Sequence, residues 1–293
     1  MEGNFSNVVR SIFLIGDPIK HSISPQIHNA AFRRENIPYK YKTKQVKKIN
    51  LPDILEKFKT DGTVGFNVTI PYKTFILKYL DEITPIAQEI GAVNTVKIEN
   101  GKLIGTNTDI VGIKEAISNA NFRIKQDLSI VIIGAGGAAR SVASYFSKHN
   151  IQLSIINRTL RKAENLCNDI SNHPTNAAEF CSYSLDIPEI ETIFQSADLL
   201  INATPVGMWP IIDENILQDF VPTSSQWVFD LVYNPIESQL VKTAKKNGCK
   251  LISGLDMLIY QASEAFKWWT GKNPDINLMN NVAIDFFSSI SSK

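Results

Sequence analysis

The sequence predicts an α/β protein of two domains with a cleft between them, the first built on a mostly parallel sheet. Three observations lead to this expectation. Short apolar runs alternate with helical stretches, which is typical of sheets covered by helices. The alternation restarts at Ser129, and the length of 293 residues suits about two domains of roughly 150 residues each. A glycine-rich turn, Gly134 to Ala139, follows the first apolar run of the second series.

The N-terminal elements follow from apolar runs and turn residues. Val9 to Ile15 is a short apolar run closed by Gly-Asp-Pro, which predicts a buried strand. Ser24 before Pro25 is typical of a helix start, with serine as the N-cap and proline in the first turn. Pro71 similarly predicts the opening of a helix. We therefore expect strands at 9–15, 39–46 and 65–70, and helices at 25–36, 51–59 and from 71 onward.

A tight hairpin is expected at Asn100-Gly101, because this dipeptide between two strand-like runs is a strong signal for a type I′ turn. The two runs are 93–98 and 102–106. With Asn100 and Gly101 as the loop, the register places Asn94 opposite Asn107. Asp109 then lies just beyond the end of the ladder, close to Asn94.

The second series of elements predicts another sheet covered by helices. Its domain boundary is expected within 110–128. Two helices near the C-terminus have no strand partner of their own, so the first domain can be discontinuous. The expected strands are 129–133, 153–157, 197–202, 227–231 and 249–252, and the expected helices are 138–148, 238–246, 255–270 and 275–289.

Composition excludes several classes of protein. Apolar residues make up 44% and charged residues 20%, which is typical of a folded chain with a buried core. The net charge of +1 argues against a nucleic-acid partner. No apolar run approaches the roughly 20 residues that cross a membrane. The start, MEGNFSNVVR, has no apolar stretch of the signal-peptide kind, so a cytoplasmic location is expected.

Cysteine and histidine give no indication of a metal site. The three cysteines are far apart and form neither a disulfide framework nor a zinc-binding pattern. The four histidines form no HExxH motif or similar cluster. We therefore expect no metal. These residues are Cys167, Cys181, Cys249, His21, His28, His149 and His173.

The glycine-rich turn predicts a bound dinucleotide. Gly134-Ala135-Gly136-Gly137-Ala138-Ala139 has the spacing GxGxxA, directly after an apolar strand and before a helix. The first glycine allows a tight turn, the second lets the backbone approach a pyrophosphate, and the small third residue allows close packing of helix on strand. The pyrophosphate then lies at a helix N-terminus. An ordinary glycine-rich turn is the alternative.

The end of the next strand indicates which dinucleotide binds. NAD-binding folds place an Asp or Glu about 20 residues after the glycines, on the ribose 2′-hydroxyl. Here the strand ends at Asn157-Arg158-Thr159, followed by Arg161 and Lys162, with no carboxylate. Arginine binds a 2′-phosphate through two parallel hydrogen bonds. We therefore predict NADP, the alternative being solvated cations at a helix start.

Polar residues in the first domain indicate a small anionic substrate. Ser22 and Ser24 flank the first helix start, where hydroxyls and free N–H groups suit a carboxylate. Ser24 alone would be an ordinary N-cap. Asn67 and Thr69 share one face of the third strand, at the carboxyl end where ligands bind in open α/β sheets. Lys73 follows, and taken singly it would be a surface lysine.

Further polar residues complete the candidate site. Gln261 lies on an otherwise apolar helix face, where a structural and a ligand-binding glutamine fit equally well. Asn94 and Tyr233 are additional candidates. A lysine in the first turn of a helix is disfavoured by the dipole, and a nearby Asp109 would compensate. The residues thus predict a nicotinamide dehydrogenase for a small carboxylated substrate, with Lys73 and Asp109 as its titratable pair.

Nine short motifs follow one another in order through both halves of the chain. They are SISP (Ser22–Pro25), FNVTIPYK (Phe66–Lys73), GAVNT (Gly91–Thr95), GTNTD (Gly105–Asp109), GAGGAAR (Gly134–Arg140), NRT (Asn157–Thr159), NATPVGM (Asn202–Met208), VYNP (Val232–Pro235) and GLDMLIYQA (Gly254–Ala262). In this order they resemble the motifs of the shikimate dehydrogenase family. Because they extend over essentially the whole length, the match is specific.

The resemblance implies a reaction and a division of the chain. Members of the family reduce 3-dehydroshikimate to shikimate with NADPH, in aromatic amino-acid biosynthesis. Lys73 would transfer the proton, paired with Asp109, while the hydride comes from the nicotinamide. Residues 1–112 together with 255–293 would form the substrate-binding domain. Residues 113–254 would form the NADP-binding Rossmann domain.

The resemblance also implies roles for individual residues. Ser22 and Ser24 would hold the substrate carboxylate, with Tyr233 near it. The ring hydroxyls would be bound by Asn67, Thr69, Lys73, Asn94, Asp109 and Gln261. For the cofactor, Gly134, Ala135, Gly136, Gly137 and Ala138 would hold the pyrophosphate, Asn157, Arg158, Thr159 and Lys162 the adenosine 2′-phosphate, and Ala203, Thr204, Leu231, Gly254 and Met257 the nicotinamide side.

Departures from the family pattern leave alternatives open. Many NADP-dependent members have Arg where this chain has Lys162, which keeps the charge and loses the planar clamp. Quinate-preferring relatives often have Thr in place of Ser24 and an acidic residue near Arg158, and this chain has neither. The alternatives are relaxed quinate or NAD use, and a non-catalytic NADP-binding sensor. The expected partner is a small molecule, with no nucleic acid or membrane, in a monomer or homodimer.

Overall fold

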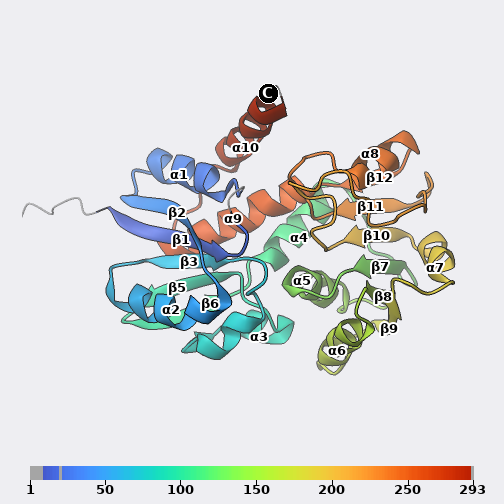
Figure 1. The fold of residues 1–293 in the computed structure, drawn as a ribbon, viewed down its shortest axis with the longest axis horizontal. Helices are drawn as coiled ribbons and strands as arrows, with labels where there is room; N and C mark the ends of the chain where they lie inside the picture. The colour runs from blue at the N-terminus through green and yellow to red at the C-terminus, as the bar shows by residue number, and fades with distance from the viewer. Residues whose placement is uncertain (1–8, 20–21, 292–293) are drawn as a thin grey trace, which may run out of the picture. The chain divides into compact units, whose positions relative to one another are not determined.

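The computed structural model describes residues 9–19 and 22–291 and contains two compact units (Figure 1). Unit 1 comprises Met1–Thr84, Val93–Thr108 and Ala262–Lys293. Unit 2 comprises Pro85–Ala92 and Asp109–Gln261. Residues 1–8, which carry most of the MEGNFSNVVR stretch, and His21 lie outside the described residues.

Unit 1 contains a six-stranded mixed sheet in the order β2-β1-β3-β5-β6-β4. The pairs β1–β2, β1–β3 and β4–β6 are parallel, whereas β5 pairs antiparallel with both β3 and β6. The alternation of strand and helix predicts the parallel part, and the hairpin supplies the antiparallel part. The strands are β1 (Arg10–Gly16), β2 (Tyr39–Gln45), β3 (Gly65–Val68), β4 (Glu82–Ile83), β5 (Thr95–Glu99) and β6 (Lys102–Thr106).

The predicted hairpin between β5 and β6 is confirmed, in the predicted register. Asn100 has φ 51° and Gly101 has φ 74°. A type I′ turn needs a positive φ at both of these positions. The ladder ends with Thr95 opposite Thr106, and the Asn94 N–H donates to the Thr106 carbonyl at 3.2 Å. The hairpin therefore brings Asn94 to the end of the sheet where β3 also ends.

Helices cover both faces of this sheet. Adjacent residues of a strand point to opposite faces. Phe13 of β1 stacks on Phe58 of α2, with ring centroids 4.9 Å apart. Tyr41 of β2, which is in register with Ile12, stacks on His28 of α1. The covering helices and short turns are α1 (Ser24–Arg34), η1 (Lys48–Asn50), α2 (Leu51–Thr60), η2 (Phe75–Tyr79) and α10 (Ile276–Ser291), with α10 packed along α1.

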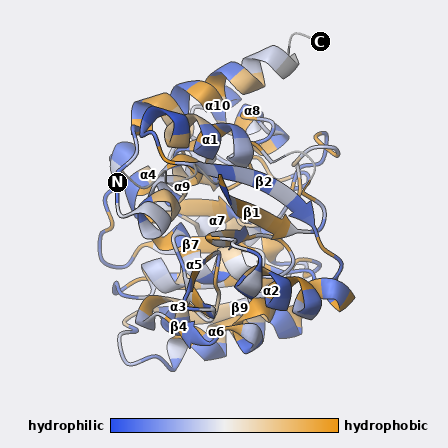
Figure 2. Ribbon diagram, turned by 90° about the vertical axis from the view of Figure 1, so that its left-hand side faces the viewer, coloured by the Kyte–Doolittle hydropathy of each residue, from blue (hydrophilic) through white to orange (hydrophobic). Residues whose placement is uncertain are grey.

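The edge strand β2 differs in character from its neighbour β1. Figure 2 shows β1 mostly in the hydrophobic colour and β2 mostly in the hydrophilic one. The cause is the alternation of Lys40, Lys42 and Lys44 with residues of the other face. Charged side chains on an edge strand oppose pairing with a further strand. On the inward face, Tyr41 is only 1% exposed.

The helix expected from Pro71 onward is absent, and this prediction is wrong. The segment between β3 and η2 forms turns instead. The Tyr72 N–H donates to the Thr69 carbonyl at 2.9 Å, and the Lys73 carbonyl accepts from the Val93 N–H at 2.8 Å. These contacts to a neighbouring segment replace the helical ladder. Lys73 therefore does not lie in the first turn of a helix, and the dipole argument for it does not apply.

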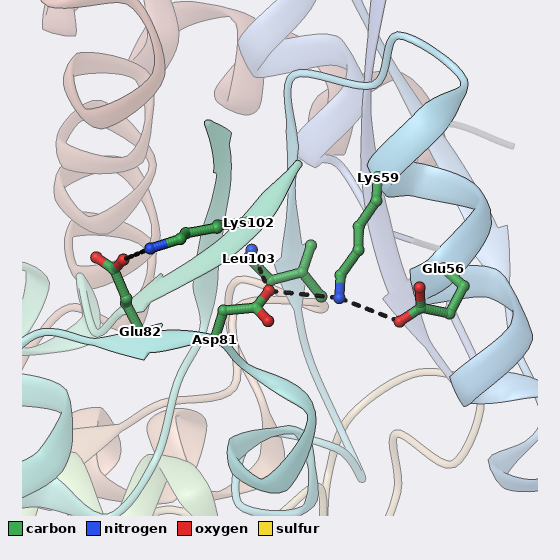
Figure 3. Close-up of polar contacts among 6 residues, drawn as sticks. All are labelled: Glu56, Lys59, Asp81, Glu82, Lys102 and Leu103. Carbon is green, nitrogen blue, oxygen red and sulfur yellow. Dashed lines mark hydrogen bonds and ion pairs between the residues drawn. The ribbon is translucent and has the colours of Figure 1, made fainter. Parts of the chain in front are cut away.

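Ion pairs lie along the β4–β6 edge of unit 1, and one of them comes from α2 (Figure 3). Lys59 Nζ lies 3.4 Å from Asp81 Oδ2, and Lys102 Nζ lies 2.8 Å from Glu82 Oε1. The Leu103 N–H donates to Asp81 at 2.8 Å, and this bond holds the pKa of Asp81 below its usual range. Pairs at the protein surface contribute little to stability.

Unit 2 contains a six-stranded parallel sheet in the order β12-β11-β10-β7-β8-β9. The strands are β7 (Ser129–Ile133), β8 (Gln152–Asn157), β9 (Glu179–Ser184), β10 (Leu199–Asn202), β11 (Trp227–Asp230) and β12 (Lys250–Ile252). The helices are α3 (Pro85–Ile90), α4 (Asp109–Asn119), α5 (Gly137–Phe146), α6 (Leu160–Ser171), α7 (Ile190–Ser196) and α8 (Gln239–Lys246). Helix α9 (Gly254–Thr270) begins in unit 2 and ends in unit 1.

The core of unit 2 has two layers, one on each face of the sheet. Ile130 and Ile132 pack with α4, α5 and α6 in one cluster of buried residues. Val131 and Ile133 pack with α7, α8 and the segment around Phe220 in the other. Strands buried on both faces are apolar throughout, which is why continuous apolar runs predict them correctly. The doubly wound architecture expected of the second domain is confirmed.

Several elements of unit 2 are absent from the sequence-based expectation. They are β9 and the helices α3, α4 and α7, and of α6 only the start near Lys162 is expected. Strand β9 is an edge strand whose residues are exposed or half-buried, so it lacks an apolar run. Within residues 9–19 and 22–291, no helix is both long and apolar enough to cross a bilayer.

Candidate active site

The glycine-rich turn connects β7 to α5. Gly134 has φ 115°, a conformation that favours glycine, and a Cβ there would meet the Ala203 carbonyl oxygen at 3.0 Å. Gly136 is the N-cap of α5, and a Cβ on it would meet nothing within 4 Å. Because neither glycine carries a side chain, the backbone N–H groups at the start of α5 suit a phosphate.

This turn lies where the strand order reverses. Counted from β7, the sheet has the order 6-5-4-1-2-3. This is the doubly wound order of dinucleotide-binding folds, in which the ligand binds at the carboxyl ends of the strands where the order reverses. Here those strands are β7 and β10. The residues present therefore fit a dinucleotide, both in the turn and in its place in the sheet.

A buried carboxylate joins the segments that follow β10 and β11. Asp230 is 1% exposed and accepts from Asn202 Nδ2 at 2.9 Å and from the Ser238 hydroxyl. Asn202 Oδ1 in turn accepts from the Thr204 N–H at 3.0 Å and the Thr204 hydroxyl at 2.7 Å. Burial raises the pKa of Asp230 to about 6. The network fixes backbone that carries residues expected on the nicotinamide side.

Cations follow the carboxyl end of β8. Asn157 Nδ2 donates to the Thr159 carbonyl at 2.9 Å, and Thr159 is the N-cap of α6. Arg158 is exposed, and so is Lys162 in the first turn of α6. That turn contains no acidic residue. The arrangement suits a bound anion, because a helix N-terminus disfavours cations that have no anionic neighbour.

Ser22 and Ser24 lie side by side at the start of α1. Their hydroxyl oxygens are 3.1 Å apart, and the Ser24 N–H donates to Ser22 Oγ at 3.2 Å. The prediction that Ser24 is the N-cap is wrong. Ile23 is the N-cap, in a helical conformation without a side-chain bond. The proline therefore follows one position later in the helix, and the Ser24 side chain is not used as a cap.

Asn67 and Asn94 are joined in one buried network. Asn67 Nδ2 donates to the Asn94 carbonyl at 3.0 Å and to Thr95 Oγ1 at 2.9 Å. Asn94 Oδ1 accepts from the Thr108 N–H at 2.8 Å. Thr69 is half-buried and lies one residue beyond β3, so only Asn67 of this pair is a strand residue.

Lys73 and Asp109 belong to different units. Lys73 is half-buried in the turn after β3. Asp109 is 3% exposed and is the first residue of α4, where the helix dipole favours a carboxylate. Ser141 Oγ lies 3.5 Å from Asp109 Oδ2. The pairing of Lys73 with Asp109 stays a prediction.

The other candidate residues lie in unit 2. Gln261 is half-buried on α9 and donates to the Leu258 carbonyl at 2.9 Å. Met257 is 7% exposed and packs in the core of unit 2. A Cβ on Gly254 would meet the Asp230 carbonyl oxygen at 2.2 Å, so only glycine fits there. Tyr233 is half-buried in the segment after β11.

His28 is a buried residue of unit 1 for which the sequence pattern predicts no role. It is fully buried on α1 and stacks on Tyr41 with ring centroids 4.5 Å apart. Within the part of the chain that the structure describes, neither ring nitrogen has a hydrogen-bond partner. Burial lowers the pKa of His28 to about 3. The ring is therefore neutral in the folded protein.

Replacing His28 with Phe is expected to change how stability depends on pH. In wild type, the unfolded chain gains a proton on His28 as the pH falls below about 6.5, whereas the folded chain does not. When the pH is lowered from about 7 to about 5, protonation of His28 in the unfolded chain lowers the free energy of unfolding of the wild type by about 2 kcal/mol. The variant does not lose this stability. Urea unfolding of both proteins at the two pH values measures the difference. Parallel pH dependence of the two proteins would refute it.

Among the described residues, no three His, Cys, Asp or Glu side chains are grouped closely enough to hold a metal ion. Cys167, Cys181 and Cys249 are free thiols. Burial raises the pKa of Cys167 to about 12, which makes it a poor nucleophile.

Unit 2 has a doubly wound sheet with a glycine-rich turn, and unit 1 has polar side chains near the ends of its own sheet. Together these features define the class of two-sheet nicotinamide dehydrogenases. Models of three protein-family segments match the chain. They are the shikimate dehydrogenase substrate binding domain at residues 14–96, shikimate / quinate 5-dehydrogenase at 116–247, and the shikimate 5'-dehydrogenase C-terminal domain at 254–284. The chain belongs to the shikimate dehydrogenase family.

Individual relatives agree with this assignment. A shikimate dehydrogenase (NADP(+)) of Methanocaldococcus jannaschii is 47% identical over 279 residues, 94% of this chain and 96% of the relative. A crystal structure of shikimate dehydrogenase in complex with NADP+ is 46% identical, covers 95% of this chain and 96% of its own, and has a TM-score of 0.84. The structure of a quinate dehydrogenase from Corynebacterium glutamicum in complex with NAD is 31% identical and has a TM-score of 0.83. The match covers 94% of this chain and 99% of that chain. Fold alone therefore does not separate the two activities.

Proposed function

We propose that this chain is an NADP-dependent shikimate dehydrogenase, which reversibly reduces 3-dehydroshikimate to shikimate in aromatic amino-acid biosynthesis. The observation that carries the proposal is a set of two polar groups in unit 1, Ser22 with Ser24 and Asn67 with Asn94, in a chain whose other sheet has the dinucleotide-binding order. The identity of 47% to a shikimate dehydrogenase (NADP(+)) supports the same substrate and cofactor.

The cofactor is held by unit 2. The segment from Gly134 to Ala138 binds the pyrophosphate at the start of α5. Asn157, Arg158, Thr159 and Lys162 bind the 2′-phosphate, where the exposed guanidinium of Arg158 supplies two parallel hydrogen bonds. Ala203, Thr204, Leu231, Gly254 and Met257 form the nicotinamide side. When bound, the nicotinamide supplies or accepts the hydride.

Polar side chains from both units hold the substrate. Ser22 and Ser24 bind the carboxylate, and their hydroxyls already lie together at the start of α1. Tyr233 lies near the same carboxylate. The ring hydroxyls bind to Asn67, Thr69, Lys73, Asn94, Asp109 and Gln261.

Lys73 transfers the proton. In the reduction, its ammonium group donates to the oxygen that becomes the alcohol, and it stabilises the negative charge that develops there. In the oxidation, the neutral amine takes the proton back. Asp109, a buried carboxylate, pairs with Lys73.

The proposal includes the organisation of the chain. Residues 1–112 with 255–293 form the substrate-binding domain, and residues 113–254 form the NADP-binding domain. Helix α10 packs along α1, which supports including the C-terminal helices in the first domain. The enzyme acts in the cytoplasm as a monomer or homodimer, with small molecules as its partners.

Mixing the protein with shikimate and NADP+ tests the proposal through the absorbance of reduced nicotinamide. Steady turnover is expected. Absence of turnover with shikimate and with quinate, together with retained NADPH binding, would indicate a non-catalytic NADP-binding sensor instead. Turnover with quinate and none with shikimate would agree with the fold and with the role of Lys73, and it would refute shikimate as the substrate.

A further inference from the structure

Tyr41 is held on three sides in unit 1. Its backbone exchanges two hydrogen bonds with the Asn29 side chain of α1, at 2.8 and 2.9 Å. Its ring stacks on His28 at an interplanar angle of 9° and contacts Trp269 with centroids 6.1 Å apart. Its hydroxyl donates to Asn67 Oδ1 at 2.6 Å. Such a side chain has little freedom to move.

The direction of each hydrogen bond around Asn67 follows from the chemistry of its neighbours. The Asn94 carbonyl can only accept, so the group of Asn67 that faces it at 3.0 Å must be the amide nitrogen. The carbonyl oxygen of the Asn67 amide therefore faces Tyr41, and Tyr41 must donate. Thr95 Oγ1 accepts from Asn67 at 2.9 Å and donates to Asn94 Oδ1 at 3.0 Å. The amide of Asn67 thus has one allowed orientation.

We propose that Tyr41 is the positioning residue of Asn67 and that Thr95 acts with it from the other side. The proposal rests on the proposed function, in which Asn67 binds a ring hydroxyl of the substrate. Tyr41 is buried, so it acts through Asn67. Without the Tyr41 hydroxyl, Asn67 Oδ1 loses its donor, and the amide loses one of three contacts that fix it.

The same geometry specifies what Asn67 offers to a ligand. Both hydrogens of its Nδ2 are engaged, by the Asn94 carbonyl and by Thr95. The amide can therefore take part in one further bond as an acceptor, through the second lone pair of Oδ1. A substrate hydroxyl is then bound as a donor. A ketone oxygen, which only accepts, would have no partner at this position.

Replacing Tyr41 with Phe tests the proposal, since only the hydroxyl is removed. A typical hydrogen bond contributes about 1 kcal/mol, so the KM for shikimate should rise about fivefold. The KM for NADP+ and kcat should stay within about twofold, because unit 2 is unchanged. Tyr39→Phe is the matched control: Tyr39 lies on the same strand and packs on Phe32 at 5.7 Å. An unchanged KM for shikimate in Tyr41→Phe, or equal changes in both KM values, would reject the proposal.

Thr95 provides a second test that does not depend on Tyr41. Thr95→Val should raise the KM for shikimate in the same selective way, and Thr95→Ser, which keeps the hydroxyl, should restore it. A merely structural role would lower the melting temperature without this selectivity. If wild type does not oxidise shikimate at all, the proposed function fails. If wild type is active and Thr95→Val has wild-type KM values, only the positioning role fails.

Discussion

Replacing Lys73 with Met is expected to lower kcat for shikimate oxidation by about 10²- to 10⁴-fold, the range found for loss of a general acid or base. Methionine keeps most of the side-chain length and removes the ammonium group. The affinity for shikimate should change much less than kcat, because the proton is transferred only in the chemical step. Steady-state kinetics of variant and wild type, with shikimate binding measured by calorimetry, make the comparison.

A matched control sharpens this test. Lys78→Met is the control, because Lys78 is an exposed lysine of the same segment that lies over the Phe75 ring. A Lys73→Met variant with wild-type kcat would remove Lys73 from the chemistry.

A double-mutant cycle tests the pairing of Lys73 with Asp109. If the two act as a unit, Lys73→Met combined with Asp109→Asn should be little slower than Lys73→Met alone. If the two effects on kcat multiply, the residues act independently. The second result would agree with Lys73 as the proton-transfer residue and would refute Asp109 as its partner.

Replacing Arg158 with Ala is expected to lower kcat/KM for NADP+ by about 10- to 100-fold, since a hydrogen bond to a charged group contributes about 1.5–3 kcal/mol. The value for NAD+, which has no 2′-phosphate, should change less than about threefold. Activity with both cofactors at matched shikimate concentration measures the preference. The variant should therefore discriminate between the cofactors much less than wild type.

Two further variants test whether the cofactor preference depends on an arginine at this particular position. Arg123→Ala removes an exposed arginine of unit 2 that lies in the segment between α4 and β7, and it should leave the cofactor preference unchanged. Lys162→Arg restores a planar guanidinium beside Arg158 and should strengthen the preference for NADP+. An equal loss for NADP+ and NAD+ in Arg158→Ala would show that Arg158 does not bind the 2′-phosphate.

Local signals account for what the sequence predicts well. The Asn100-Gly101 turn is specified by two residues that tolerate positive φ, and its register follows from the turn. The glycine-rich turn and the apolar strands of unit 2 are equally local, because each strand is buried on both faces. The central strands and the cofactor turn are therefore predictable from the amino-acid sequence alone.

Tertiary contacts account for what the sequence predicts poorly. Pro71 does not begin a helix because Val93, from a distant segment, bonds the Lys73 carbonyl. The Asp230–Asn202 and Tyr41–Asn67 contacts join residues that are 28 and 26 positions apart. The only local signal for Tyr41 is its place among alternating lysines, which puts it on the inward face of β2. This signal predicts that Tyr41 is buried, but it does not predict that its hydroxyl binds Asn67.

Values of kcat/KM for the four combinations of shikimate or quinate with NADP+ or NAD+ decide whether the protein is an NADP-dependent enzyme for shikimate. We predict that shikimate with NADP+ has the highest value, that quinate is poorer with either cofactor, and that NAD+ is poorer with either acid. A higher value for quinate than for shikimate, or for NAD+ than for NADP+, would contradict the assignment of the substrate or the role of Arg158, respectively.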